Sequence, residues 1–306
     1  MTVGWRRVRS ASQAIWLTAV LGFAARFAWR HADELAALEL GVRWKAWVLA
    51  LVLLLGAKVL ISLMVHASWR AAGADLGLVQ AAYTYNMSQL PKYVPGGIWP
   101  YVSRVGMARA RDLEMPRIWR GLALETAMLL GGAVALAALA LDASSLLPAL
   151  GMAPGGAWIG AARVGALACL AVGLAVVAGR VPHRGGALTR AVLLSLGAWA
   201  LLALSFLAVV LALSGGASVT GGGAGVSPLV PVSLAGLFAF AWILGFVAVF
   251  SPAGIGVREV ILGVGLAGLG GPALAAAIVV GHRLLYLVAD ALCALAAVAF
   301  LRPGRR

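Results

Sequence analysis

The sequence contains little charge and few acidic residues. Charged residues make up 11% of the 306 positions, where a soluble globular domain carries about 25%. Hydrophobic residues make up 63%, and the mean hydropathy is +0.99. A water-soluble protein of this length cannot bury that much apolar surface. Because strands of alternating polarity are also missing, we expect an all-α integral membrane protein, a polytopic helix bundle.

Motifs for metals, nucleotides and nucleophilic catalysis are missing too. Cys169 and Cys293 lie in apolar segments without paired spacing, which argues against a disulfide framework or a metal site. There is no HExxH, CxxC or nucleophile elbow, and the glycine run at 221–225 lacks the Lys-Ser/Thr of a phosphate-binding loop. We therefore expect no metal, no cofactor and no ATP-driven cycle within this chain.

Basic residues outnumber acidic ones, 24 to 10, but their placement argues against a nucleic-acid partner. They cluster before residue 10, at 104–120, at 180–190 and after 301, between apolar stretches, whereas 142–155 and 214–231 contain none. Basic loops favour the cytoplasmic side. We expect a multi-pass protein of the bacterial inner (plasma) membrane with both termini in the cytoplasm; the basic connection at 30–45 is the exception.

Hydropathy predicts six full spans, at about 11–29, 46–68, 121–141, 156–178, 191–213 and 272–301. The first resembles a signal peptide, but it is too long for a cleaved segment and is interpreted as a retained helix. Tryptophans near span ends are typical of an aromatic belt: Trp29, Trp44, Trp69, Trp119 and Trp158. Two further apolar regions, about 76–108 and 232–268, are interrupted by proline and glycine. Each is predicted to form two half-helices, because proline breaks the helical hydrogen-bond pattern.

The two breaks indicate an internal repeat. Val94–Ile98 (VPGGI) and Ser251–Ile255 (SPAGI) lie about half the chain apart. The basic clusters stay on one side only if each broken region returns to the side it entered from, the first from the cytoplasm and the second from outside. The chain 1–306 is thus predicted to be a single transmembrane domain with inverted repeats 1–141 and 156–301. Matching broken helices in inverted halves predict a transport site near the midplane.

The residues around the breaks carry a family resemblance. Lys92–Trp99 with Arg104 resembles a Lys-Tyr-x-Pro-Gly-Gly break followed by Arg, and Pro252–Glu259 resembles Pro-x-Gly-Ile-Gly-x-Arg-Glu. These are the two signatures of the lysylphosphatidylglycerol synthase transmembrane, or flippase-like, family. Family members carry similar residues at the positions of Glu125, Arg283 and Tyr286. The resemblance implies lipid translocation; the aminoacyl-transferase domain of the best-known members does not occur in this sequence, so we expect no lipid aminoacylation.

A binding site follows from the breaks. A half-helix that starts inside the membrane points free N–H groups and its positive end into the site. Arg104 and Arg258 are expected to hold a headgroup phosphate at two symmetry-related points, because a guanidinium grips phosphate through two bonds. The alternative is that the prolines are packing kinks and the arginines extend to an interface. The predicted substrate-binding residues are Lys92, Tyr93, Pro95, Gly96, Gly97, Arg104, Glu125, Pro252, Gly254, Gly256, Arg258, Glu259, Arg283 and Tyr286.

Other intramembrane polar residues are further candidates, since charges are rare in a bilayer and usually face a bundle interior. They are Lys58, His282 and Asp290, the last as an ion-pair partner or proton carrier. Glu125, about one turn into its span, is expected to face the groove. Glu259 is expected to meet Arg283 or His282 across the bundle, because adjacent helical residues point apart. The tyrosines around the first break contact either a headgroup or the interface: Tyr83, Tyr85, Tyr93 and Tyr101.

Three functions fit this pattern. The leading hypothesis is a non-enzymatic translocator that moves an anionic phospholipid or polyprenyl-phosphate-type lipid between leaflets. The second is an integral-membrane enzyme that uses Glu125, Glu259 or Asp290 as acid or base. The third is an accessory subunit of a lipid synthase or glycosyltransferase in envelope biogenesis. Sparse charges spread over depth favour transport. The sequence names neither the lipid nor an oligomeric state.

Overall fold

The computed structural model describes residues 43–74, 76–93, 98–141, 157–180, 186–214, 229–248, 254–269 and 271–300, with Arg26, Trp29, Arg30 and Ser251. Most residues in these ranges are helical, and none of them is in a strand. Most of the predicted span at 11–29, most of the predicted outer connections, and four predicted site residues lie outside the described residues. Those four are Pro95, Gly96, Gly97 and Pro252.

Five of the predicted full spans form long helices: α3 (Trp44–Ala71), α6 (Met115–Ala140), α8 (Ala157–Arg180), α9 (Ala187–Leu213) and α13 (Gly271–Phe300). Among the described helices, α3, α6, α9 and α13 are long and apolar enough to cross a membrane. This indicates a membrane-embedded, all-α protein. That α8 also crosses remains a prediction.

The start of α6 differs from the prediction. The helix begins at Met115 rather than near 121, because Pro116 occupies its first turn, where a missing N–H and a fixed φ are favourable. The longer helix places Glu125 almost three turns from the start, and the expectation of one turn was wrong. Glu125 is therefore deep in the bundle, 2% exposed.

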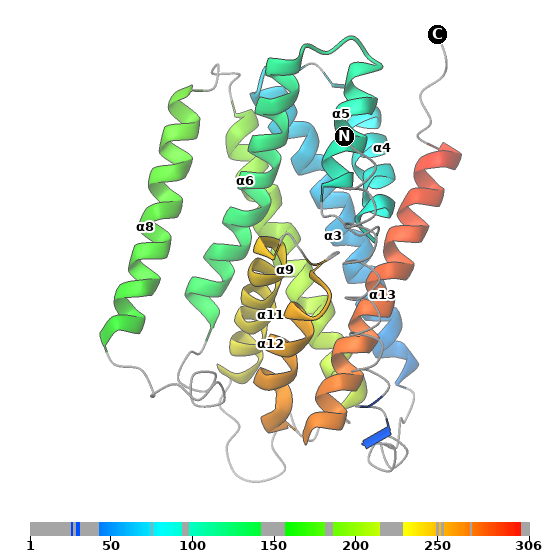
Figure 1. Ribbon diagram of the computed structural model, residues 1–306, viewed down its shortest axis with the longest axis vertical. Helices are drawn as coiled ribbons and strands as arrows, with labels where there is room; N and C mark the ends of the chain where they lie inside the picture. The colour runs from blue at the N-terminus through cyan, green and yellow to red at the C-terminus, as the bar shows by residue number, and fades with distance from the viewer. Residues whose placement is uncertain are drawn as a thin grey trace, which may run out of the picture.

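Each broken region forms two helices, as predicted. The first contains α4 (Leu78–Gln89), the 3₁₀ turn η1 (Leu90–Tyr93) and α5 (Trp99–Arg109); the second contains α11 (Leu229–Val247), α12 (Val257–Leu266) and η3 (Ala267–Leu269). At 1.5 Å per residue, the 10 to 12 residues of α4, α5 and α12 cover less than about 20 Å, too short for a ~30 Å hydrocarbon core. In Figure 1, α4 and α5 occupy the upper half of the molecule, and α11 and α12 the lower half.

The long helices are joined by hydrogen bonds to backbone carbonyls, which substitute for water in an apolar medium. The most extensive helix pair is α3 with α9, where the Ser205 hydroxyl donates to the carbonyl of Ala50 at 2.8 Å. The Trp199 indole N–H of α9 donates to the carbonyl of Leu129 on α6, also at 2.8 Å. These two helices approach closely at Gly132, where a Cβ would lie 2.4 Å from Cδ1 of Trp199.

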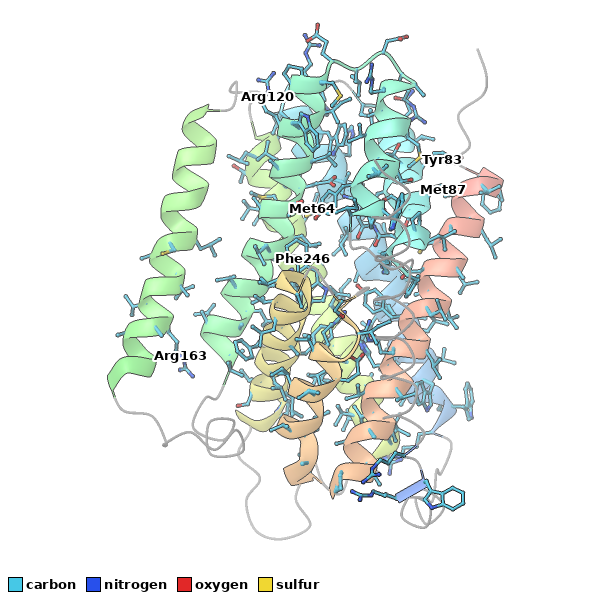
Figure 2. The ribbon with its side chains drawn as sticks, in the orientation of Figure 1. Met64, Tyr83, Met87, Arg120, Arg163 and Phe246 are labelled. Atoms are coloured by element: carbon cyan, nitrogen blue, oxygen red, sulfur yellow. The ribbon has the colours of Figure 1, made fainter. Side chains whose placement is uncertain are left out.

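The outward face of α13 carries large apolar side chains, as a lipid-facing surface requires. Leu284 and Leu295 are 58% and 66% exposed, whereas Asp290 on the same helix is 1% exposed. Figure 2 places Arg120 near the upper end of the bundle and Arg163 in its lower half, away from Met64 and Phe246 at mid-height. Apolar residues therefore face outward, and the buried charges gather inside.

Candidate functional site

A partly open cavity of about 350 Å³ lies inside the bundle. Met64 and Phe246, which both line it, lie near mid-height of the molecule (Figure 2). Most of its wall is apolar or aromatic. The two broken regions contribute to it, here called the first hairpin (α4, η1 and α5) and the second hairpin (α11 and α12), together with α3, α6, α9 and α13. Among the described residues, the charged side chains that line it are four cations and one carboxylate: Lys92, Arg104, Arg258, Arg283 and Glu125.

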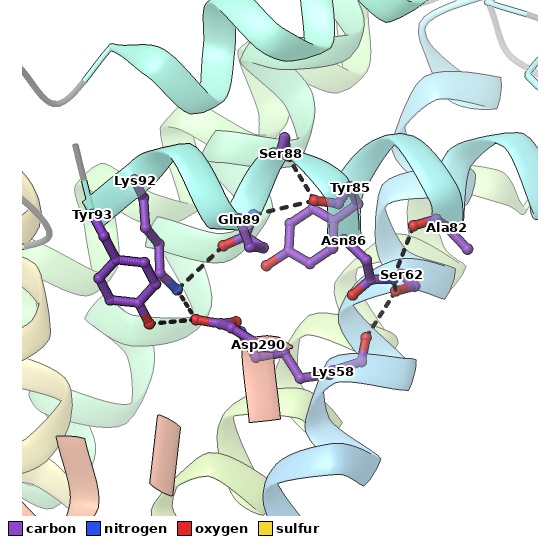
Figure 3. Close-up of polar contacts among 10 residues, drawn as sticks. All are labelled: Lys58, Ser62, Ala82, Tyr85, Asn86, Ser88, Gln89, Lys92, Tyr93 and Asp290. Carbon is purple, nitrogen blue, oxygen red and sulfur yellow. Dashed lines mark hydrogen bonds and ion pairs between the residues drawn. The ribbon is translucent and has the colours of Figure 1, made fainter. Parts of the chain in front are cut away.

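Asp290 of α13 organises one side of the cavity. Its carboxylate lies 2.5 Å from Nζ of Lys58 on α3 and 2.5 Å from Nζ of Lys92 on η1. It also accepts a 2.6 Å hydrogen bond from the Tyr93 hydroxyl. Figure 3 shows Asp290 between Lys58 and the Lys92–Tyr93 pair. One carboxylate thus fastens the end of the first hairpin to α3 and α13, and two lysines share its single negative charge.

A second polar chain connects α4 to α3 beside this cluster. The Asn86 amide donates to the Ser62 hydroxyl at 3.1 Å, and Ser62 donates to the carbonyl of Lys58 at 2.9 Å (Figure 3). All three side chains are buried. These bonds hold the first hairpin at a fixed depth and thereby position Lys92 at the cavity wall.

Arg104 of α5 forms a closed ion pair with Glu125 of α6. Its Nε donates to the Ser88 hydroxyl at 2.8 Å, and the guanidinium lies 5.1 Å and 5.5 Å from the ring centres of Tyr85 and Tyr101. The other Glu125 oxygen accepts a 2.8 Å bond from the indole N–H of Trp69. Charge, hydrogen bonds and stacking are therefore all satisfied within the protein.

Trp69 departs from the aromatic-belt prediction. Although it lies near the end of α3, it is 1% exposed and packs against Gly121, where a Cβ would lie 2.8 Å from Cδ2 of its ring. Trp29, Trp44 and Trp119 are 86%, 60% and 56% exposed, as side chains at a membrane interface would be. Trp69 instead serves as a hydrogen-bond donor to Glu125, so the belt interpretation is wrong for this residue.

Arg258 of α12 has a different environment. Among the described residues it has no hydrogen-bond or ion-pair partner, and its Nε is buried. Its aliphatic stem lies in a notch made by Gly245 and Gly254. A Cβ on Gly245 would lie 2.3 Å from Cγ of Arg258, and one on Gly254 would lie 3.0 Å from its Cδ. The notch directs the guanidinium along the cavity wall and leaves it available to a ligand.

Glu259 supports this region rather than lining the cavity. One carboxylate oxygen accepts a 2.6 Å bond from the backbone N–H of Gly256 and caps α12. The other accepts a 2.5 Å bond from Nε of Arg283 on α13, which confirms the contact expected from the sequence. Gly254 and Gly256 have φ angles of +70° and +91°, which glycine adopts without strain. The second break therefore ends in a capped helix that positions two arginines.

His282 lies in the core and not at the cavity. It is 3% exposed, and its ring centre lies 5.3 Å, 5.2 Å and 6.0 Å from those of Phe206, Phe238 and Tyr286. Tyr286 does line the cavity, and its ring lies 4.3 Å from Nζ of Lys58. His282 thus packs behind the wall that Tyr286 forms.

Eight of the predicted binding residues line the cavity together: Lys92, Tyr93, Arg104, Glu125, Gly254, Arg258, Arg283 and Tyr286. Gly256, Glu259, Lys58 and Asp290 lie behind them as supports. Sequence reasoning missed Trp199, Trp242 and Phe246, which form an aromatic part of the lining. For Trp199, its position in the middle of a span was the available signal, because tryptophan usually lies at a membrane interface.

The described part of the chain holds no group of His, Cys, Asp and Glu side chains that would bind a metal ion. No family model matches the chain, and no curated protein matches it. The resemblance to the flippase-like family therefore depends on the two sequence signatures.

Proposed function

We propose that this protein is a membrane lipid translocator of the flippase-like type, which moves an anionic phospholipid or polyprenyl-phosphate-type lipid between leaflets. The headgroup passes through the cavity between the two hairpins, and the hydrocarbon tail stays in the bilayer. The observation that carries the proposal is the charge of the cavity: among the described residues, four cations and one carboxylate line it inside a membrane-embedded helix bundle.

The charge lining argues for an anionic ligand on energetic grounds. A cation near the bilayer centre costs about 2.5–3.5 kcal/mol on insertion scales, so an excess of cations there needs compensation. An anionic headgroup supplies it, and Arg258 and Arg283 offer guanidinium groups that match phosphate oxygens. The aromatic part of the wall, with Trp199 and Trp242, offers an apolar surface for the part of the lipid next to the headgroup.

The enzyme alternative finds less support. A general acid or base needs a carboxylate or imidazole that can exchange protons with a substrate. Glu125 is paired with Arg104, Glu259 with Arg283, and Asp290 with two lysines. Carboxylates engaged in this way are suited to positioning cations, which favours binding over acid–base catalysis.

We further propose that the halves are inverted, with the α4–α5 hairpin entering from the cytoplasm and the α11–α12 hairpin from outside. Their positions in opposite halves of the molecule support this arrangement (Figure 1). Single cysteines at Glu114 and Gly268, both exposed, should react with a membrane-impermeant maleimide from opposite sides of the membrane. Both cysteines are introduced one at a time into the double variant Cys169→Ser/Cys293→Ser, which has no cysteine of its own and should not be labelled. Labelling of both positions from the same side would contradict the inverted arrangement.

The translocation proposal is tested with purified protein in liposomes that contain a headgroup-labelled anionic lipid. An impermeant quencher added outside reports how fast the inner-leaflet label becomes accessible. We expect faster exchange than in protein-free liposomes, and a much smaller increase with Arg258→Ala. Equal exchange with and without protein, across anionic phospholipids and polyprenyl phosphates, would refute the proposal.

A further inference from the structure

The charges around the cavity do not balance. Five cationic side chains accompany three carboxylates, which leaves an excess of two positive charges among the described residues when His282 is neutral. The cations are Lys58, Lys92, Arg104, Arg258 and Arg283, and the carboxylates are Glu125, Glu259 and Asp290.

The excess is located at two points. Arg104 and Glu125 cancel each other within a closed pair. Lys58 and Lys92 share Asp290, and of these two lysines only Lys92 lines the cavity. Arg283 is paired with Glu259, which leaves the charge of Arg258 without a carboxylate in the described part of the chain. One uncompensated charge therefore belongs to each hairpin end, at Lys92 and at Arg258.

We propose that the cavity takes a headgroup with two negative charges, a phosphate monoester or a diphosphate, held between Lys92 of the first hairpin and Arg258 of the second. This inference rests on the proposed function and narrows its substrate class. A phosphate monoester carries −1.5 to −2 charges near neutral pH, whereas a diester such as phosphatidylglycerol carries one. Only the former compensates both cations in a medium of low dielectric constant.

Lys92 can leave Asp290 for a phosphate because Asp290 has other partners. Its side chain is 19% exposed, whereas those of Lys58 and Asp290 are 2% and 0% exposed. When Lys92 turns to a phosphate, Asp290 keeps the ion pair with Lys58 and the hydrogen bond from Tyr93. The ligand thus gains a cation without leaving a buried carboxylate unpaired.

The test measures the binding of two short-chain lipids of equal acyl length, phosphatidic acid and phosphatidylglycerol, to the purified protein in neutral detergent. The pH is about 8, where the monoester is a dianion. Microscale thermophoresis gives each Kd. We expect phosphatidic acid to bind about tenfold or more tightly. Lys92→Gln and Arg258→Gln should each reduce that ratio towards one, and Lys92→Arg should preserve it. Arg117→Gln is the control, since Arg117 is 46% exposed and paired with Glu114 outside the cavity.

The outcomes separate this inference from the proposed function. Equal Kd values for the two lipids, both weakened by Arg258→Gln, would overturn the dianion inference and leave anionic lipid binding intact. A preference for phosphatidic acid that persists in Lys92→Gln and Arg258→Gln would also overturn it. If neither lipid binds in a way that the cavity variants change, the translocation proposal fails as well. Inorganic phosphate is titrated in parallel: variant-sensitive binding as tight as that of phosphatidic acid would support a dianion site and contradict a lipid ligand.

Discussion

The two Pro-Gly breaks are each followed by an arginine, and the two arginines have opposite environments. Arg104 is 8% exposed, paired with Glu125, bonded to Ser88 and stacked between two tyrosines. Arg258 has a buried Nε without a partner in the described chain and lies along the cavity wall. Similar sequence signatures therefore produce one closed and one open site.

The difference changes how the two residues are expected to act. A buried ion pair whose hydrogen bonds are complete gains little from a ligand, and breaking it leaves an uncompensated charge. A guanidinium without a partner gains both charge compensation and hydrogen bonds when a phosphate arrives. We therefore infer that Arg104 stabilises the first hairpin and Arg258 binds the headgroup, in place of the symmetric clamp expected from the sequence.

The largest expected effect is on stability, at the closed pair. Arg104→Ala should lower the free energy of unfolding by about 3–5 kcal/mol, because Glu125 remains buried without its cation. Thermal or denaturant unfolding in detergent, followed by circular dichroism, measures this. Arg258→Ala is the matched control and should change stability by less than about 1 kcal/mol. A larger loss of unfolding free energy for Arg258→Ala than for Arg104→Ala would contradict the assignment of Arg104 to the closed site and Arg258 to the open one.

The next effect is on transport, at the open site. Arg258→Ala should reduce the initial rate of leaflet exchange about tenfold or more while the protein stays folded and monodisperse. Arg258→Lys should retain an intermediate rate, because lysine keeps the charge but lacks the two-pronged contact. The liposome quenching assay measures both variants. A wild-type rate in Arg258→Ala would show that this arginine is not part of the transport path.

A smaller effect is expected from the notch that positions Arg258. In Gly245→Ala, the new Cβ would lie within 2.6 Å of both Cγ and Cδ of Arg258, so the stem must shift. We expect the exchange rate to fall a few-fold, because a misplaced guanidinium raises the activation free energy by about 1 kcal/mol. Gly263→Ala on α12 is the control, because its Cβ meets nothing within 4 Å. Equal rates in the two variants would mean that the position of the stem does not matter.

The sequence predicted the helices well and their pairing poorly. Hydropathy located the long helices, and proline with glycine located both breaks, because these signals are local. The contact between Glu259 and Arg283 was also predictable, since Arg258 and Glu259 had to point apart on α12. Local rules could thus place residues on helix faces, and the faces that carry charge were expected to point into the bundle.

The contact of Arg104 with Glu125, and that of Glu125 with Trp69, were not predictable in this way. Glu125 and Trp69 lie on α6 and α3, and which helix faces meet depends on packing that no local pattern specifies. Glu125 was expected only about one turn into its span because the start of α6 was placed too late, and Trp69 was expected in the aromatic belt because it lies near a span end. Both residues are buried by the docking of three helices, which only the three-dimensional structure shows.

The most direct measurement compares Arg258→Gln with the double variant Arg104→Met/Glu125→Gln in the liposome assay. The double variant removes the closed pair without leaving a net charge, and the amide oxygen that replaces the carboxylate can still accept the indole bond of Trp69. We predict that wild-type protein moves anionic lipid between leaflets, that the double variant keeps most of this rate, and that Arg258→Gln loses most of it. A wild-type rate in Arg258→Gln together with a loss in the folded double variant would contradict the account.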